Sequence, residues 1–364
     1  TTYDVQVTGR GNVPSGAGAV VLNVTAAKPA SGPLSDGYLM VFPTGARPAQ
    51  DTSNLNFAAT DVAVPNLVVA PVGTGGKVSV FNKYGNTEVI FDVMGWFPAG
   101  GAVNRMTPAR ILDTRSDQTG VVDDFNAALG PNGTYDVQVA GRGGLPTVGV
   151  GAVILNVTAV KPASGPLAEG YLMVFPTGNR PAQDTSNLNF SGTDMAIPNL
   201  VIAPVGANGK VSVFNKYGNT EVIFDVMGWF PAGGVFHPVT PARVLDTRAD
   251  QTGVIDDYNA PLGPDGIDDV LVHTRGGVPN TAGAVILNVT AVKPASGPLS
   301  PGYLMVFPTG NRPASDTSNV NFFPGDLAVP NAVISPIGSG GRVSVLNKYG
   351  TTEVIFDVMG YFPA

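Results

Sequence analysis

Three aspartates in apolar surroundings are the first candidates for chemistry. Asp92, Asp225 and Asp357 each stand in the sequence Phe-Asp-Val-Met-Gly. Successive residues of a strand point to opposite faces, so each aspartate faces away from the phenylalanine and valine beside it. A buried carboxylate needs a cation or several hydrogen-bond donors. Such a group could act as a general acid, but we expect a buried ion pair that locks the strand in place.

Five arginines are candidate partners for these carboxylates. They are Arg10, Arg142 and Arg275, or the arginines that end the Leu-Asp-Thr-Arg motif, Arg115 and Arg248. Removing one member of a buried pair leaves an uncompensated charge. We therefore predict that Asp225→Ala destabilises the protein without abolishing ligand binding.

Acid–base and nucleophilic catalysis have few candidate residues in this chain. There is no cysteine, and the two histidines, His237 and His273, stand where the other copies of their segments have different residues. A Ser–His–Asp site would therefore exist in one copy only. Gly73–Lys77 resembles part of a phosphate loop, but Val78 stands where Ser or Thr would bind magnesium, which indicates a turn. We expect no enzymatic activity and no cofactor.

Two groups of oxygen-bearing residues could bind calcium. The side-chain oxygens at this spacing are of the type that calcium prefers, but the pattern lacks the glycine and terminal glutamate of an EF-hand loop. A solvated acidic loop is the favoured interpretation. The residues are Asp123, Asp124 and Asn126, and then Asp256, Asp257 and Asn259.

Three aromatic residues occupy equivalent positions, each followed by Phe-Pro. Trp96, Trp229 and Tyr361 could stack on sugar rings if they were exposed. Packing at a junction is the favoured interpretation, because a large amphipathic ring is useful there.

Charge and composition exclude several classes of protein. Among 364 residues, 13% are charged, 43% are hydrophobic and the net charge is −7. An acidic chain without a basic patch is not expected to bind nucleic acid. No apolar run reaches the roughly 18 residues of a membrane span. The 47 glycines and 32 prolines suit many short strands joined by turns. Because the chain begins with Thr1, we expect it to be a trimmed part of a longer protein.

A long internal repeat organises the sequence. The string Leu-Asn-Val-Thr-Ala begins at Leu22, Leu155 and Leu287, so the copies are spaced by 133 and then 132 residues. A period this long indicates a repeated domain and not a turn of a solenoid. We predict three repeats: 1–98, then 99–231 and 232–364, each of the last two beginning with a segment that contains Leu-Asp-Thr-Arg.

We call the segments that contain Leu-Asp-Thr-Arg the connectors. The sequence has two connectors and three repeats. They carry Thr-Pro-Ala-Arg-(Ile/Val)-Leu-Asp-Thr-Arg at 107–115 and 240–248. In one interpretation Ile111 and Leu112 belong to a strand of the following repeat, and a preceding connector has been removed. In the other, the connector braces two neighbours. We favour the first.

Each repeat is predicted to contain about seven short strands. In repeat one they span 3–7, 19–25, 38–42, 53–57, 63–72, 77–81 and 88–97, in runs rich in β-branched and aromatic residues. The turn residues at 82–86 predict a hairpin between the last two. The predicted fold is all-β, with three tandem antiparallel β-sandwich domains of about 130 residues, Ig-like or jelly-roll-like. A barrel is the second choice.

The motifs together resemble a known kind of repeat. Leu-Asp-Thr-Arg, Leu-Asn-Val-Thr-Ala, Ser-Asn-Leu-Asn-Phe and Asp-Val-Met-Gly-(Trp/Tyr)-Phe are similar to repeats of secreted actinobacterial cell-surface proteins. In those proteins the repeats often sit beside cell-wall amidase or protease domains, which carry the chemistry. The resemblance covers essentially the whole chain and implies an extracellular, cell-surface setting without a catalytic mechanism.

Two functional hypotheses follow. The first is a non-enzymatic structural or adhesive surface protein, such as a stalk or filament subunit, that associates head to tail with itself or with other surface proteins. The second is a carbohydrate-binding array in which three weak sites gain avidity for cell-wall or surface glycans.

Overall fold

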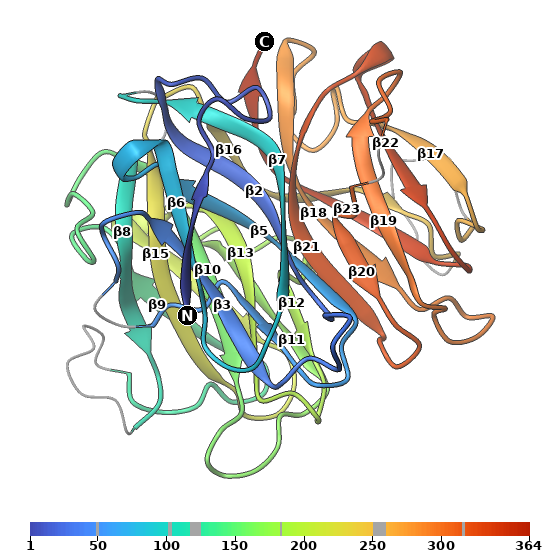
Figure 1. Cartoon of the computed structure of the whole chain (residues 1–364), viewed down its shortest axis with the longest axis horizontal. Helices are drawn as coiled ribbons and strands as arrows, with labels where there is room; N and C mark the ends of the chain where they lie inside the picture. Colours follow the sequence, from blue (N-terminus) through green and yellow to red (C-terminus); the bar gives the residue numbers. More distant parts are fainter. Residues whose placement is uncertain (49–50, 101–103, 117–124, 183, 250–259, 315–316) are drawn as a thin grey trace. The chain divides into compact units, whose positions relative to one another are not determined.

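The computed structural model describes the chain except residues 49–50, 101–103, 117–124, 183, 250–259 and 315–316 (Figure 1). Within the described residues, helical structure consists of three short 3-10 turns, Thr74–Gly76, Ala207–Gly209 and Ser339–Gly341. None of these is long and apolar enough to cross a membrane. The first of them lies between two strands, as expected for the turn at Gly73–Lys77.

Repeat one contains seven strands, whose ends lie within two residues of the predicted ones. They are β1 (Thr2–Gln6), β2 (Ala17–Ala27), β3 (Gly37–Pro43), β4 (Leu55–Phe57), β5 (Ala63–Pro71), β6 (Lys77–Asn82) and β7 (Glu88–Pro98). Their Val, Ile and Phe residues suit a pleated, half-buried surface, and Gly, Pro and Asn residues separate them.

Repeats two and three each begin with one additional strand, which lies in the connector. Repeat two has β8 (Asn104–Asp113), β9 (Gly133–Gln138), β10 (Val150–Val160), β11 (Gly170–Pro176), β12 (Leu188–Phe190), β13 (Ala196–Pro204), β14 (Lys210–Asn215) and β15 (Glu221–Pro231). Repeat three has β16 (His237–Asp246), β17 (Gly266–Leu271), β18 (Ala282–Val292), β19 (Gly302–Pro308), β20 (Val320–Phe322), β21 (Ala328–Pro336), β22 (Arg342–Asn347) and β23 (Glu353–Pro363).

The strands form six small antiparallel sheets. In repeat one the orders are β1-β6-β3-β4 and β5-β2-β7; in repeat two they are β9-β14-β11-β12 and β13-β10-β15-β8; in repeat three they are β17-β22-β19-β20 and β21-β18-β23-β16. Five sheets therefore have four strands, and the sheet that contains β7 has three because it lacks a connector strand.

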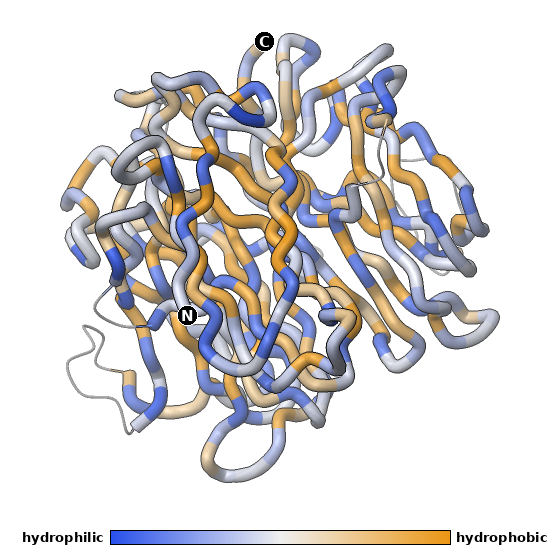
Figure 2. The backbone as a smooth tube through the Cα atoms, in the orientation of Figure 1, coloured by the Kyte–Doolittle hydropathy of each residue, from blue (hydrophilic) through white to orange (hydrophobic). Residues whose placement is uncertain are grey.

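The hydrophobic core of each repeat draws on both of its sheets. In repeat two it includes Ile111 and Leu112 of β8, Val157 of β10, Val174 of β11 and Phe224 of β15. Figure 2 shows hydrophobic residues running along the strands. In β10 and β15 the core residues stand at alternate strand positions, whereas β8 contributes two adjacent residues where its register shifts.

The all-β class is confirmed, but the prediction of three tandem sandwich domains is wrong. The strands are arranged as six small sheets, the sheet composition of a six-bladed β-propeller. Each described sheet also keeps two edge strands, so the barrel is not observed either. Chain contacts define two compact units: 1–180 with 188–234, and 181–187 with 235–364. A sequence repeat counts copies, but it does not show that each copy folds apart from its neighbours.

The predicted hairpin between the last two strands of repeat one is also wrong. β6 pairs with β1 and β3, whereas β7 pairs with β2 in the other sheet. The turn residues at 82–86 therefore connect two sheets. Turn chemistry shows where a strand ends, but it does not show which strand becomes its neighbour.

Candidate functional site: the connector strand and its acceptor edge

The connector strand β8 lies at the edge of a sheet of repeat two, beside β15 (Figure 1). In this register Leu112 lies opposite Phe224 and Arg110 lies opposite Asp225. The structure thus places Ile111 and Leu112 in a strand of the following repeat. Strand β16 pairs with β23 in the same way, with Arg243 opposite Asp357.

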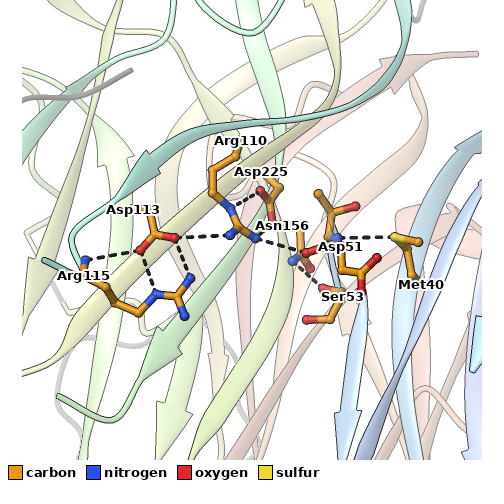
Figure 3. Close-up of polar contacts among 9 residues, drawn as sticks. Met40, Asp51, Ser53, Arg110, Asp113, Arg115, Asn156 and Asp225 are labelled. Atoms are coloured by element: carbon orange, nitrogen blue, oxygen red, sulfur yellow. Dashed lines mark hydrogen bonds and ion pairs between the residues drawn. The ribbon is translucent and has the colours of Figure 1, made fainter. Parts of the chain in front are cut away.

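A buried ionic network joins β8 to β15 (Figure 3). Arg110 Nε donates to Asp225 Oδ1 at 2.9 Å, and Arg110 Nη2 donates to Asp225 Oδ2 at 3.2 Å. Arg110 Nη1 also donates to Asp113 Oδ2 at 3.2 Å. Arg115 holds Asp113 in turn, with bonds of 2.9 and 2.7 Å. The two carboxylates are thus bridged by one guanidinium in a planar, two-pronged geometry.

Burial and charge act in opposite directions on the Asp225 carboxyl. Its side chain is 1% exposed, and that of Arg110 is 10% exposed. Burial raises the pKa of Asp225, and the Arg110 guanidinium opposes this rise. Asp357 has the same environment: burial raises its pKa and Arg243 opposes the rise. Both carboxylates are enclosed in the fold, and each is paired with an arginine of the neighbouring connector strand.

The network also holds a loop of the preceding repeat. Arg110 Nη2 donates to the carbonyl of Asp51 at 3.3 Å, and Asn156 Nδ2 donates to the carbonyl of Ser53 at 2.7 Å. These bonds join repeats one and two, which lie in one compact unit.

Repeat three binds the corresponding loop, residues 181–187, in the same way. Arg243 Nη2 donates to the carbonyl of Asp184 at 3.1 Å, and Asn288 Nδ2 donates to the carbonyl of Ser186 at 2.7 Å. This loop belongs to the second compact unit together with repeat three. In both cases, therefore, one arginine of the connector and one asparagine of the following repeat bind the same two positions of a loop with the sequence Asp-Thr-Ser-Asn.

The loop at Asp51 is held from its own repeat as well. Tyr38 Oη donates to the Asp51 carboxylate, and Arg47 and Lys83 approach it at 3.0 and 3.2 Å. The Tyr38 hydrogen bond is the main cause that lowers the pKa of Asp51. Burial raises the pKa of Tyr38, and its bond to Asp51 adds to that effect. The side chain of Asp51 thus holds the loop to repeat one, while its backbone carbonyl accepts a hydrogen bond from Arg110.

Among the described residues, no strand pairs with the outer side of strand β7 of repeat one. Its sequence, Glu88–Pro98, is identical to that of β15, Glu221–Pro231. Val222 and Ile223 are 0% and 6% exposed, whereas the equivalent Val89 and Ile90 are 36% and 48% exposed. Strand β7 is therefore an open acceptor edge.

Asp92 has no arginine partner among the described residues. Burial raises its pKa, and a hydrogen bond with Asn23 opposes the rise. In repeat two the corresponding asparagine, Asn156, holds Ser53 of the preceding repeat. Asp92 is half-buried, so its carboxylate is partly desolvated. Its counterparts Asp225 and Asp357 each have an arginine partner.

The aromatic candidates differ in exposure. Trp96 is 42% exposed. Trp229 packs against the core of repeat two, and Tyr361 packs against the core of repeat three. The Tyr361 ring is also stacked on His237, with the ring centroids 4.9 Å apart. The three positions therefore do not form equivalent exposed platforms.

Most of the calcium candidates lie outside the described residues. These are Asp123, Asp124, Asp256, Asp257 and Asn259; Asn126 is described and is exposed. Among the described residues, no group of three histidine, cysteine, aspartate or glutamate side chains is placed to hold a metal ion.

Sequence reasoning missed Arg110 and Arg243 as the partners of the buried aspartates. It named instead Arg10, Arg142 and Arg275, or Arg115 and Arg248. The last two pair with Asp113 and Asp246 of their own connectors. Both arginine pairs stand in the same connector motif. The pairing depends on a register shift: Leu112 lies beside Phe224, and the irregularity between Phe224 and Asp225 places Arg110, and not Ile111, beside Asp225.

Comparisons with known proteins identify no family. No family model matches the chain, and no curated protein matches it at a significant level. Two solved structures share a weak likeness. A structure titled for the triple jelly roll fold and turret assembly of an archaeal virus has a TM-score of 0.23 and 9% identity, covering 100% of this chain and 82% of that chain. The atomic structure of Sulfolobus turreted icosahedral virus has a TM-score of 0.22 and 10% identity, covering 100% and 83%. Both scores are too low to bear on the fold or function of this chain.

Proposed function

We propose that this chain is a non-enzymatic structural or adhesive repeat protein of the extracellular cell surface, which associates with other copies through the open edge β7. The observation that carries the proposal is the contrast between two identical strands. Strand β15 is covered by a connector strand, and β7 has an open edge with exposed apolar side chains. The resemblance of the sequence motifs to repeats of secreted actinobacterial cell-surface proteins supports a location at the cell surface.

The open edge has the properties of a surface that pairs with another chain. An unpaired strand presents free backbone donors and acceptors, and soluble proteins commonly block such edges with charges, prolines or bulges. On β7 the exposed residues include Val89 and Ile90. The strand carries two acidic residues, Glu88 and Asp92, and a register shift between Val93 and Gly95, but no lysine and no internal proline. Addition of a strand to this edge would bury Val89 and Ile90 and complete a four-stranded sheet.

The junction between repeats supplies a model for head-to-tail association. Inside the chain, a loop with the sequence Asp-Thr-Ser-Asn binds the network of the next repeat through Asp51 and Ser53. The third repeat carries the same sequence at 316–319. Inside the chain these two bonds reach β8 and β10, and β10 has a counterpart in repeat one, β2. Contact between the third repeat's loop and repeat one of another copy would be heterologous and would build a chain of molecules.

The ionic networks support a structural role over a catalytic one. Asp225 and Asp357 are each 1% exposed and bound to an arginine at 2.9 Å. A general acid must reach its substrate, and these carboxylates are enclosed between strands.

A glycan-binding role is the second proposal, and Trp96 is the residue that supports it. Its exposed ring could stack on a sugar, whereas Tyr361 is already stacked on His237. One free platform gives little avidity. Loss of binding to a glycan array in Trp96→Ala, with Tyr84→Ala as an exposed control, would favour this role; equal binding by both would exclude it.

The test of the first proposal is the concentration dependence of association. We expect sedimentation velocity and negative-stain microscopy to show larger species as the concentration of the chain rises. Ile90→Lys places a charge on the open edge and should abolish them, because an edge charge opposes strand pairing. Val148→Lys is the matched control, since Val148 is an exposed apolar residue of repeat two outside the strands. A chain that stays monomeric, or that loses association equally in both variants, contradicts the proposal.

A further inference from the structure

An exposed aliphatic residue stands at the same position of each repeat, directly before β5, β13 and β21. These residues are Val62, Met195 and Leu327, and their side chains are 53%, 66% and 45% exposed. The residue differs in all three copies, although the copies are otherwise closely similar, and it is aliphatic in each. An exposed position without a function is expected to accept polar residues, so the retained apolar character indicates a contact surface.

A lysine lies beside each of these aliphatic residues. The three lysines directly follow β2, β10 and β18, and the backbone N of Lys28 donates to the carbonyl of Val62 at 2.8 Å. The other two lysines make the same bond at 2.9 Å. All three are exposed, and none of them forms an ion pair with another described residue. We call each lysine with its aliphatic neighbour a tip: Lys28 with Val62, Lys161 with Met195, and Lys293 with Leu327.

The aspartate before each aliphatic residue is held by its own turn. It accepts a hydrogen bond from the backbone N three residues earlier, at 2.7, 2.6 and 2.8 Å, and it is half-buried in each repeat: Asp61, Asp194 and Asp326. Two further carboxylates, Asp36 and Glu169, are exposed in the segments that follow the lysines of repeats one and two, and repeat three has Pro301 at that position. The tip of repeat three therefore presents a lysine without an exposed carboxylate in 293–301 or 323–327.

The tips of repeats one and two lie close together within the first compact unit. Asn56 Nδ2 of β4 donates at 2.8 Å to the carbonyl of Ala196, the residue after Met195. Burial raises the pKa of Asp61, and the Asp194 carboxylate adds to the rise, which reflects the same proximity. Two aliphatic side chains and two lysines are thus close enough to meet one extended surface.

The variation among the tips favours an apolar medium without a fixed shape. A protein partner holds the important side chains of an interface in well-packed pockets that fit one residue, and a stable interface buries about 1,200–2,000 Å². One protruding side chain for each repeat offers neither. The hydrocarbon of a lipid bilayer accepts valine, methionine or leucine alike. Proteins that lie on a bilayer combine such apolar side chains with lysines that attract anionic headgroups.

We infer that the tips are attachment points for an anionic phospholipid surface. The aliphatic side chain of each tip enters the boundary between headgroups and acyl chains, and the lysine beside it binds lipid phosphate. Two tips on one compact unit bind more strongly than either alone, because the second attaches at high effective concentration. The inference goes beyond the proposed function and uses none of the residues of β7, so the two can fail separately.

Vesicle flotation of the full chain tests the aliphatic residues. Flotation separates bound chains from self-associated ones, which do not rise without lipid. We expect binding to vesicles of phosphatidylglycerol and phosphatidylcholine in equal parts, and much weaker binding to phosphatidylcholine alone. Met195→Asp should weaken binding to the mixed vesicles roughly tenfold. Val148→Asp is the matched control, because Val148 is also an exposed apolar residue of repeat two outside the strands, and it should bind as the original chain does.

The lysines are tested on the same mixed vesicles. Lys161→Gln should weaken binding about fivefold, and added salt should remove that difference. Lys210→Gln is the control, because it removes the same charge from β14 of the same repeat.

Three results would overturn the inference: no flotation at lipid concentrations up to about 1 mM, equal binding to the two kinds of vesicle, or equal loss in Met195→Asp and Val148→Asp. The Ile90→Lys chain separates this inference from the proposed function. An Ile90→Lys chain that no longer self-associates and still binds mixed vesicles supports the tips as the lipid site. Loss of vesicle binding in Ile90→Lys would place that binding at β7 and remove the inference.

Discussion

Strands β7 and β15 consist of the same eleven residues and differ in what lies beside them. Strand β15 is paired on both sides and almost wholly buried, whereas β7 is paired with β2 alone and is exposed along much of its length. The difference teaches that the burial of a strand is set by its neighbour. The same sequence can form part of a finished core in one repeat and a binding edge in another.

The missing strand removes several contributions to the core of repeat one. Ile111, Leu112 and Leu129 contribute to the core of repeat two, and repeat one has no counterpart of them. Burial of one such side chain contributes about 1.5–3 kcal/mol. The described core of repeat one is therefore smaller than that of repeat two.

Among the substitutions that test the comparison of β7 with β15, Arg110→Met is expected to lower the free energy of unfolding the most. It leaves Asp225 and Asp113 facing each other in the interior without their bridging cation. We expect the free energy of unfolding of the first compact unit to fall by at least about 3–5 kcal/mol, measured by denaturant unfolding. Arg10→Met is the control, because it removes the same charge from an exposed site. Equal stability of the two variants would show that the network does not lock β8 to β15.

A somewhat smaller loss is expected for Asp225→Ala. Arg110 then keeps Asp113 at 3.2 Å, so the remaining charge is still partly compensated. We expect a loss of about 3 kcal/mol and a lower melting temperature in a thermal scan. The matched variant Asp92→Ala, in the identical strand of repeat one, should lose much less. An unchanged melting temperature for Asp225→Ala would refute the strand-locking role.

The stability of repeat one should depend on pH through Asp92, a carboxyl without an arginine partner among the described residues. Burial raises the pKa of Asp92 above its ordinary value of 3.8. A group with a raised pKa in the folded state contributes stability that is complete below the ordinary pKa and is lost as pH rises through the raised one. The asparagine side chain of Asp92→Asn stays neutral at every pH. The variant protein should therefore be more stable than the original chain at pH 7 and equally stable near pH 3. Unfolding curves at both pH values provide the measurement, and a variant less stable at pH 7 contradicts the account.

The smallest effect is expected for a matched pair of threonines. Thr87→Val replaces a buried hydroxyl that has no partner with a methyl group, so stability should stay the same or rise slightly. Thr220→Val removes the bond to Asn215 and should lower stability by about 1 kcal/mol. Equal losses in the two variants, in denaturant unfolding, would indicate that the Thr87 hydroxyl is already satisfied.

Local features of the fold were predictable from the sequence, and long-range ones were not. The strands of repeat one follow from their runs of Val, Ile and Phe between turn residues. Which strand pairs with which depends on the packing of residues far apart in sequence. For this reason the turn at 82–86 suggested a hairpin, whereas β6 and β7 lie in different sheets.

The aspartates of the candidate site were predictable from the sequence, but their arginine partners were not. A carboxylate between apolar residues of a strand needs a partner, and this reasoning identified Asp225 and Asp357. The choice of arginine depended on the register of β8, where a bulge follows Arg110 and shifts the pairing. The open edge was hidden for a different reason: β7 and β15 have the same sequence, so only a structure that shows their neighbours separates them.

Amide hydrogen exchange followed by mass spectrometry tests the open edge most directly. Trp96→Phe gives the β7 peptide a mass of its own, so that it can be followed apart from β15 in the full chain. The account predicts that residues 88–98 exchange many of their amides quickly while residues 221–231 stay protected, because only β15 is paired on both sides. Equal, strong protection of the two strands would contradict it.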